Sequence, residues 1–71
     1  MALDGGADGL DFYRRIAREA TAHLNAGGFI LMETGWDQAE AVCALLKENG
    51  FTHTAAHEDF RGILRFAEGR L

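Results

Sequence analysis

The chain has 71 residues, a net charge of −4 and a single cysteine. At this length it forms at most one small domain, and one thiol excludes an intrachain disulfide. No run approaches the roughly 18 apolar residues that a membrane span needs, and the acidic balance disfavours a nucleic-acid partner. Residues 1–9 lack the basic start and apolar stretch of a signal peptide, so a reducing, cytoplasmic setting is expected.

The first part of the chain predicts a loop followed by a helix. Residues 1–9 are rich in glycine and aspartate and read as a loop, with Asp8 as the N-cap of a helix over residues 10–24. Apolar residues recur there at spacings of three and four, which predicts one packed stripe: Tyr13, Ile16, Ala17, Ala20 and Leu24. Glycines in the segment 25–28 are expected to end this helix.

A short apolar run, Phe29-Ile30-Leu31-Met32, comes next and ends in Glu33 and a glycine. Four consecutive apolar residues predict a strand buried on both faces, as in parallel sheets covered by helices. One such strand cannot form a complete sheet. The chain is therefore expected to be a single partial α/β domain spanning residues 1–71, a piece of a doubly wound fold.

The remaining segments predict a second helix and a hairpin. Asp37 with Glu40 resembles a capping box, and the inward side of the helix is expected to carry Ala39, Val42, Cys43, Leu45 and Leu46. Asn49-Gly50 should stop the helix, with Phe51 folding back on its last turn. Residues 52–57 and 63–68 predict antiparallel strands, which completes a helix–strand–helix–strand–strand order.

Three groups of residues occur with the spacing of one known family. They are residues 2–16; Leu24-Asn25-Ala26-Gly27-Gly28 followed by Met32-Glu33-Thr34-Gly35 and Gln38; and Asn49-Gly50-Phe51 followed by Asp59, Gly62 and Arg65. With them the chain resembles the C-terminal part of the HemK/PrmC-type glutamine methyltransferases. That family uses S-adenosylmethionine to methylate the N5 side-chain amide of a glutamine in peptide-chain release factors.

The resemblance implies a fold and shows which functional motifs of the family these residues do not contain. It implies the C-terminal fragment of a Rossmann-like class I methyltransferase fold, with a three-stranded mixed sheet. The first strand would lie at one edge, the last strand in the centre and the penultimate strand outermost. The family's cofactor loop, its ribose-holding acid and its Asn-Pro-Pro-Tyr motif are absent from these residues. No catalytic or cofactor-binding residue is therefore assigned, and S-adenosylmethionine is not expected to bind this chain alone.

Substrate-side candidates are Glu33, Gly5 and Gly6. Glu33 follows a strand, where α/β enzymes place functional groups, although an acid there also serves as a cap for nearby amides. Gly5 and Gly6 would border the substrate cleft of the complete enzyme; a phosphate-binding role is weakly supported, since no strand precedes them and no P-loop lysine follows.

Other polar and aromatic residues leave two interpretations open. Asp59 and Arg65 form either a substrate-facing pair or a tie across the hairpin, and the hairpin tie is favoured. His53 and His57 would stand about 13 Å apart on a strand, too far to share a metal ion. Three aromatic side chains form a recognition surface or pack against missing parts of the fold: Trp36, Phe12 and Phe60.

The strand edge over residues 29–32 predicts self-association. In the complete enzyme this edge would pair with another strand, and when exposed it offers unpaired backbone groups to a second copy. A homodimer is the simplest result. The alternative function is a non-catalytic α/β protein-interaction module that self-associates.

Overall fold

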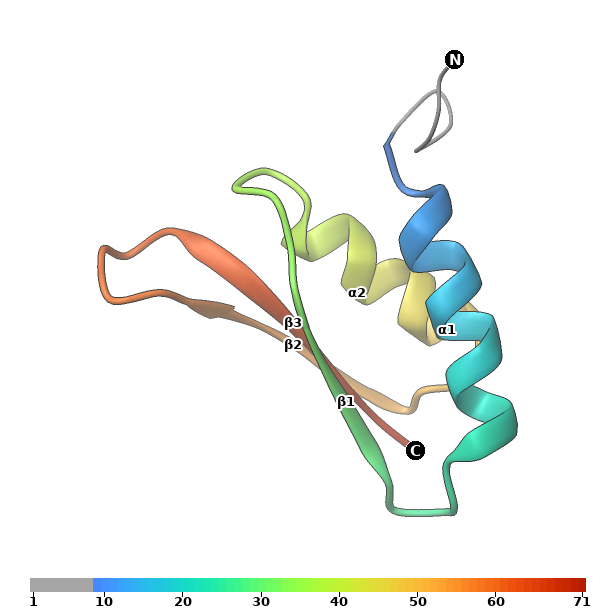
Figure 1. Cartoon of the computed structure of the whole chain (residues 1–71). Coiled ribbons are helices and arrows are strands. Elements are labelled where there is room, and N and C mark those ends of the chain that lie inside the picture. Colours follow the sequence, from blue (N-terminus) through green and yellow to red (C-terminus); the bar gives the residue numbers. More distant parts are fainter. Residues whose placement is uncertain (1–8) are drawn as a thin grey trace.

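The computed structural model describes residues 9–71. These residues form two helices and three strands in the expected order: α1 (Asp11–His23), β1 (Phe29–Glu33), α2 (Ala39–Glu48), β2 (His53–Glu58) and β3 (Leu64–Arg70). Both helices lie on one side of the sheet, so the described part has two layers (Figure 1). Neither helix is long and apolar enough to cross a membrane, a finding limited to the described residues.

The sheet has the expected strand order but not the expected mixed character. Its order is β1-β3-β2, with β3 in the centre. Both neighbours pair antiparallel to β3, so the prediction of a mixed sheet is wrong for these residues. β1 and β2 do run in the same direction. They are not bonded to each other, because the chain reverses after β2 and inserts β3 between them.

The two faces of the sheet differ in cover. The register places Ile30 opposite Gly69 and Met32 opposite Ala67, and this set faces the helices. The alternate residues of β1 point to the other side, where Phe29 and Leu31 are 57% and 56% exposed. The expectation of a strand buried on both faces is therefore wrong within residues 9–71, because both helices cover the same face.

The core lies between α2 and the central strand. Val42 and Leu46 of α2 and Ala67 of β3 are each fully buried, and Phe51 is 2% exposed. A Cβ on Gly69 would stand 3.0 Å from Cδ1 of both Leu46 and Phe51. The missing side chain at this position therefore lets α2 and Phe51 approach the centre of the sheet.

The helix starts differ from those expected. Leu10 holds the N-cap position of α1 without a side-chain hydrogen bond, and Asp8 lies outside the described residues. Gln38, not Asp37, holds the N-cap position of α2, again without a side-chain cap bond. The capping-box prediction for Asp37 and Glu40 is therefore wrong, because the turn before α2 continues through Gln38.

The helix ends differ from each other. After α1 the backbone is already extended at Leu24, and Gly27, at φ 85°, lies in the following turn instead of capping the helix. The stop of α2 is confirmed. Gly50 has φ 100°, its amide donates to the Lys47 carbonyl, and the Phe51 amide donates to the Leu46 carbonyl, both at 3.1 Å. This pair of bonds is a Schellman motif, and it drives Phe51 into the core.

Candidate functional site

The candidate site is the carboxyl end of β1, where Glu33 emerges. The side chain of Glu33 is exposed on the face away from the helices, across from Phe66 of β3. Its carboxylate has no hydrogen-bond or ion-pair partner among residues 9–71. It accepts no bond from a loop or helix amide in that part of the chain. A carboxylate placed in this way is available to accept a hydrogen bond from an incoming group.

Hydrogen bonds from α1 and to β3 hold the backbone at this end of β1 in place. The Tyr13 hydroxyl of α1 donates to the Glu33 carbonyl at 3.3 Å. The Thr34 amide donates to the Arg65 carbonyl of β3 at 2.7 Å, and Thr34 is 4% exposed. The position of Glu33 is therefore set by both a helix and the central strand.

Gln38 is a residue of this site whose role the sequence did not predict. The side-chain Oε1 of Gln38 accepts from the Gly35 backbone amide at 3.1 Å. The backbone amide of Gln38 donates to the Gly35 carbonyl at 3.0 Å. Its Nε2 donates to the Gly9 carbonyl at 3.4 Å. A Cβ on Gly35 would lie 2.8 Å from Oε1, so a larger residue there would displace the end of the Gln38 side chain. The sequence pattern that could have predicted this contact is a glutamine three residues after a glycine.

The two remaining substrate-side candidates, Gly5 and Gly6, lie outside the described residues. Their position relative to Glu33 therefore stays a prediction. Gly9, the first described residue, contacts the Gln38 amide, so the chain enters α1 beside the start of α2.

Asp59 and Arg65 belong to the hairpin between β2 and β3. Oδ1 of Asp59 accepts from the amides of Arg61 and Ile63, at 2.8 and 3.1 Å, and Oδ2 lies 3.8 Å from Arg65 Nε. Partial burial acts to raise the pKa of Asp59, but the two amide bonds and the Arg61 guanidinium hold it below the ordinary value. The ion pair between Asp59 and Arg65 agrees with the favoured interpretation of a tie across the hairpin, and the hydrogen bonds of Asp59 go to the turn amides.

The histidines of β2 have local partners. His57 Nε2 lies 2.9 Å from Glu68 Oε1 on β3, and this bond holds the pKa of Glu68 below its ordinary value against partial burial. His53 Nδ1 lies 3.1 Å from the Thr52 hydroxyl. Within residues 9–71, no three His, Cys, Asp or Glu side chains stand close enough to hold a metal ion.

The three singled-out aromatic residues belong to separate segments. Trp36 is 70% exposed in the turn before α2, Phe12 is 55% exposed in the first turn of α1, and Phe60 is 96% exposed in the hairpin. The ring contact found among the described residues joins Phe12 to its neighbour Tyr13, at 5.5 Å between centroids. The structure therefore gives these three residues no shared ring cluster.

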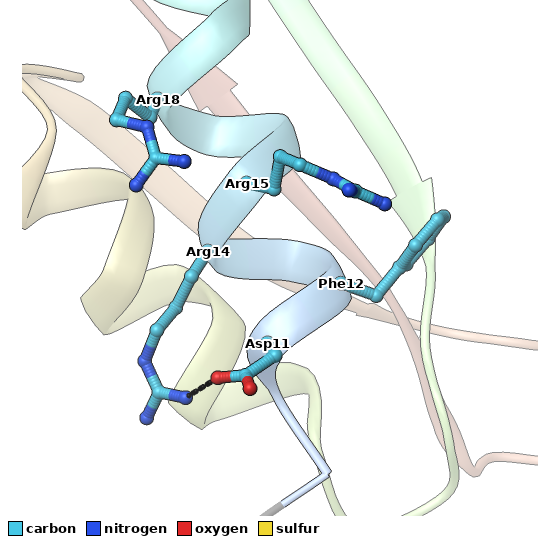
Figure 2. Close-up of a pocket in the computed structure, with 5 residues that line it drawn as sticks. All are labelled: Asp11, Phe12, Arg14, Arg15 and Arg18. Carbon is cyan, nitrogen blue, oxygen red and sulfur yellow. Dashed lines mark hydrogen bonds and ion pairs between the residues drawn. The ribbon is translucent and has the colours of Figure 1, made fainter. Parts of the chain in front are cut away.

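Among the surface hollows of the described part, two border aromatic side chains and lie outside the Glu33 site. One, of about 630 Å³, borders the outer side of α1 and is lined by Asp11, Phe12, Arg14, Arg15 and Arg18 (Figure 2). The other, of about 270 Å³, lies on the uncovered sheet face and is lined by Phe29, Leu31, His57, Phe66 and Glu68. Glu33 lines neither of them.

The described fold is a two-layer α/β unit whose polar candidate group stands at the end of a strand. No family model matches the chain. Curated relatives do match it: it is 46% identical over 70 residues to a release factor glutamine methyltransferase of Geobacter sulfurreducens, covering 99% of the chain and 25% of the relative. An enzyme of the same name from Cereibacter sphaeroides is 44% identical over 71 residues, and one from Bordetella pertussis is 46% identical over 70.

Over nearly its whole length, the chain is similar to the C-terminal part of proteins named release factor glutamine methyltransferase. It spans about a quarter of the length of the curated relatives it matches.

Proposed function

We propose that the chain supplies the C-terminal part of a cytoplasmic, S-adenosylmethionine-dependent enzyme that methylates the glutamine side-chain amide of peptide-chain release factors. The observation that carries the proposal is the 46% identity to the Geobacter sulfurreducens methyltransferase over 99% of the chain. In the proposed enzyme, this part extends a Rossmann-like, doubly wound sheet.

The chemistry explains why the end of β1 matters. An amide nitrogen is a poor nucleophile, so methyl transfer depends on holding it in line with the donor methyl group. Hydrogen-bond acceptors around the amide assist when they are already in position. In the proposal, the Glu33 carboxylate is one group facing the substrate, and the contacts of Tyr13 and Thr34 keep the strand end rigid.

The described residues do not fit the cofactor. S-adenosylmethionine carries a positively charged sulfonium, and the larger hollow is bordered by three guanidinium groups that repel it. The smaller hollow is lined mainly by apolar side chains, and its two polar residues, His57 and Glu68, are bonded to each other. Both facts support the proposal that the isolated chain is inactive.

The uncovered surfaces of the sheet also support a role as one part of a larger fold. Among residues 9–71, β1 pairs with β3 on one side and with no strand on the other. Phe29 and Leu31 stand on the uncovered face with more than half of their surface exposed. Exposed edges and contiguous apolar patches usually mark surfaces that another segment covers.

The direct test is a chimera. The C-terminal quarter of the Geobacter sulfurreducens enzyme is replaced by this chain, and methyl transfer from S-adenosylmethionine to a release factor is measured. We expect transfer by the chimera and none by this chain alone. The same relative without its C-terminal quarter is the matched control. A folded chimera without activity, beside an active parent, would contradict the proposal.

The same chimera tests Glu33. Glu33→Gln removes the charge but keeps the shape, and we expect a loss of about a hundredfold in kcat/KM, at the lower end of the range for one positioned polar group. Glu48→Gln, at an exposed position on α2, is the matched control and should leave transfer unchanged. Equal activity of the two variants would remove Glu33 from the substrate side.

A second candidate function rests on the free edge of β1. We propose as the alternative that the chain acts as a non-catalytic module and pairs with a second copy through Phe29–Glu33, forming a homodimer. Sedimentation of the isolated chain should then give twice the monomer mass, and Leu31→Lys should return the monomer. A monomeric mass at high protein concentration would exclude this alternative.

A further inference from the structure

The outer side of α1 carries a cluster of guanidinium groups outside the Glu33 site. Phe12, Arg14, Arg15 and Arg18, here called the arginine face, border the hollow of about 630 Å³ (Figure 2). Arg15 and Arg18 are exposed, and the Arg14 side chain is 42% exposed. In Figure 2 the Phe12 ring and the Arg15 side chain extend toward one side of the helix, and the Arg14 and Arg18 side chains extend toward the other.

This cluster is unusual for the charge of the chain. The chain has seven lysines and arginines against eleven acids, and three of the seven lie within positions 14–18. Arg14 binds Asp11 at 2.7 Å. Arg15 and Arg18 form no ion pair with any residue of the described part, including Glu19 beside them. Positive charge is therefore concentrated, and only partly neutralised, at this one place.

The remaining arginines contrast with this pair. Arg61 and Arg65 lie near Asp59, at 3.4 and 3.8 Å, and Arg70 lies 3.2 Å from Glu68. Those arginines serve contacts within the hairpin and the central strand. The guanidinium groups of Arg15 and Arg18 form no such ion pairs among residues 9–71.

We propose that the arginine face binds an acidic peptide segment of a partner protein. Guanidinium groups bind carboxylates through paired hydrogen bonds, and Phe12, on the side of Arg15, offers an apolar contact of the kind that anchors interfaces. A nucleic acid fits less well, because the whole chain carries −4 and repels a long polyanion. A short acidic segment senses mainly the local charge, since salt screens fields beyond about 8 Å.

The arginine face lies on the helix that contacts the candidate site. The first turn of α1 contacts the candidate site, because the Tyr13 hydroxyl bonds the Glu33 carbonyl. A protein seated at the end of β1 would therefore find the arginine face on the adjoining helix. The inference rests on the charges of α1 and does not require that the chain take part in methyl transfer.

The test uses the whole chain and a short fluorescein-labelled peptide made of glutamates around one phenylalanine. Binding is followed by fluorescence anisotropy at an ionic strength of about 0.15 M, where the Debye length of about 8 Å lets the peptide sense mainly the local charge. Arg15→Gln with Arg18→Gln should weaken binding by at least about tenfold. Lys47→Gln with Arg61→Gln, the control, removes the same charge from other elements and should change binding less than about twofold.

Two further probes decide between partners. The same peptide with glutamines in place of glutamates should not bind, and a fluorescein-labelled oligothymidylate should bind more weakly than the acidic peptide. Circular dichroism verifies that both double variants remain folded. Equal losses in the two double variants, tighter binding of the oligothymidylate, or no binding of the acidic peptide to the unsubstituted chain would each overturn the proposal.

Discussion

The covered and uncovered faces of the sheet are built from the same strands but differ in the burial of their side chains. Leu31 and Met32 are neighbours in β1, yet Leu31 is 56% exposed and Met32 is 9% exposed. Leucine is at least as hydrophobic as methionine, so composition does not explain the difference. The pleat sends successive side chains to opposite faces, and only one face meets the helices. An apolar run in a strand therefore does not by itself establish burial on both sides.

Side-chain size separates the faces further. The covered face has Ala67 and Gly69 on the central strand, where Leu46 and Phe51 pack closely. The uncovered face has the bulkier Phe66 on the same strand, opposite Glu33. The covered face is thus shaped for the chain's own helix, while the uncovered face is shaped for contacts that residues 9–71 do not make.

The largest effect is expected from truncating the covered face. Leu46→Ala should lower the free energy of unfolding by about 2–5 kcal/mol, because Leu46 is fully buried and its removal leaves a cavity. Leu31→Ala on the uncovered face should cost less than about 1 kcal/mol in the monomer. Urea unfolding of both variants measures the contrast. Similar losses would mean that the uncovered face is buried in solution.

A smaller effect is expected from adding one methyl group. Gly69→Ala places a Cβ 3.0 Å from side-chain carbons of Leu46 and Phe51, both too buried to move aside, and should cost about 1–3 kcal/mol. Ala55→Val, on the uncovered side of β2, is the control and should change stability by no more than about 0.5 kcal/mol. An unchanged urea midpoint for Gly69→Ala would show that the covered face is not tightly packed.

The smallest effect on stability is expected when the pH is lowered and Glu68, on the uncovered face, is protonated. The bond from His57 lowers the folded-state pKa of Glu68, so its stabilising contribution is present above the unfolded pKa of about 4.3 and is lost as pH falls through the folded value. Glu68→Gln should therefore flatten the decline of the urea midpoint below about pH 5. Asp59 keeps its own acid dependence, so the decline should not vanish.

The control for the acid experiment is Glu48→Gln. The Glu48 side chain is exposed and makes no ion pair within residues 9–71, so this variant should follow the acid response of the unsubstituted chain. If Glu68→Gln followed it as well, the bond between His57 and Glu68 would have no effect on stability.

Much of the fold could be predicted where the cause was local. The helix stop at Asn49-Gly50 and the burial of Phe51 were predictable, because a left-handed glycine and the two following bonds involve neighbouring residues only. The capping box at Asp37 failed even though its pattern was local. Gln38 bonded to Gly35 and extended the turn, which moved the start of α2.

The candidate site was predictable in position and less so in its contacts. Glu33 was found because it ends an apolar strand, and the structure places it at the end of β1 with a free carboxylate among the described residues. The bond from Tyr13 joins residues twenty positions apart, and the Gln38 bond to Gly9 joins residues twenty-nine apart. Contacts at such distances along the chain leave no periodic pattern in the sequence.

The sequence by itself determined the order of the helices and strands, the stop of α2 and the resemblance to a family, because these depend on neighbouring residues and on similarity along the chain. The tertiary structure decided that all neighbouring strands are antiparallel and that both helices cover one face. Pairing and cover depend on which surfaces meet after the chain reverses. The hydrophobic effect favours burial but does not specify which of two similar apolar faces is buried. The packing of the helices therefore determines which face is covered.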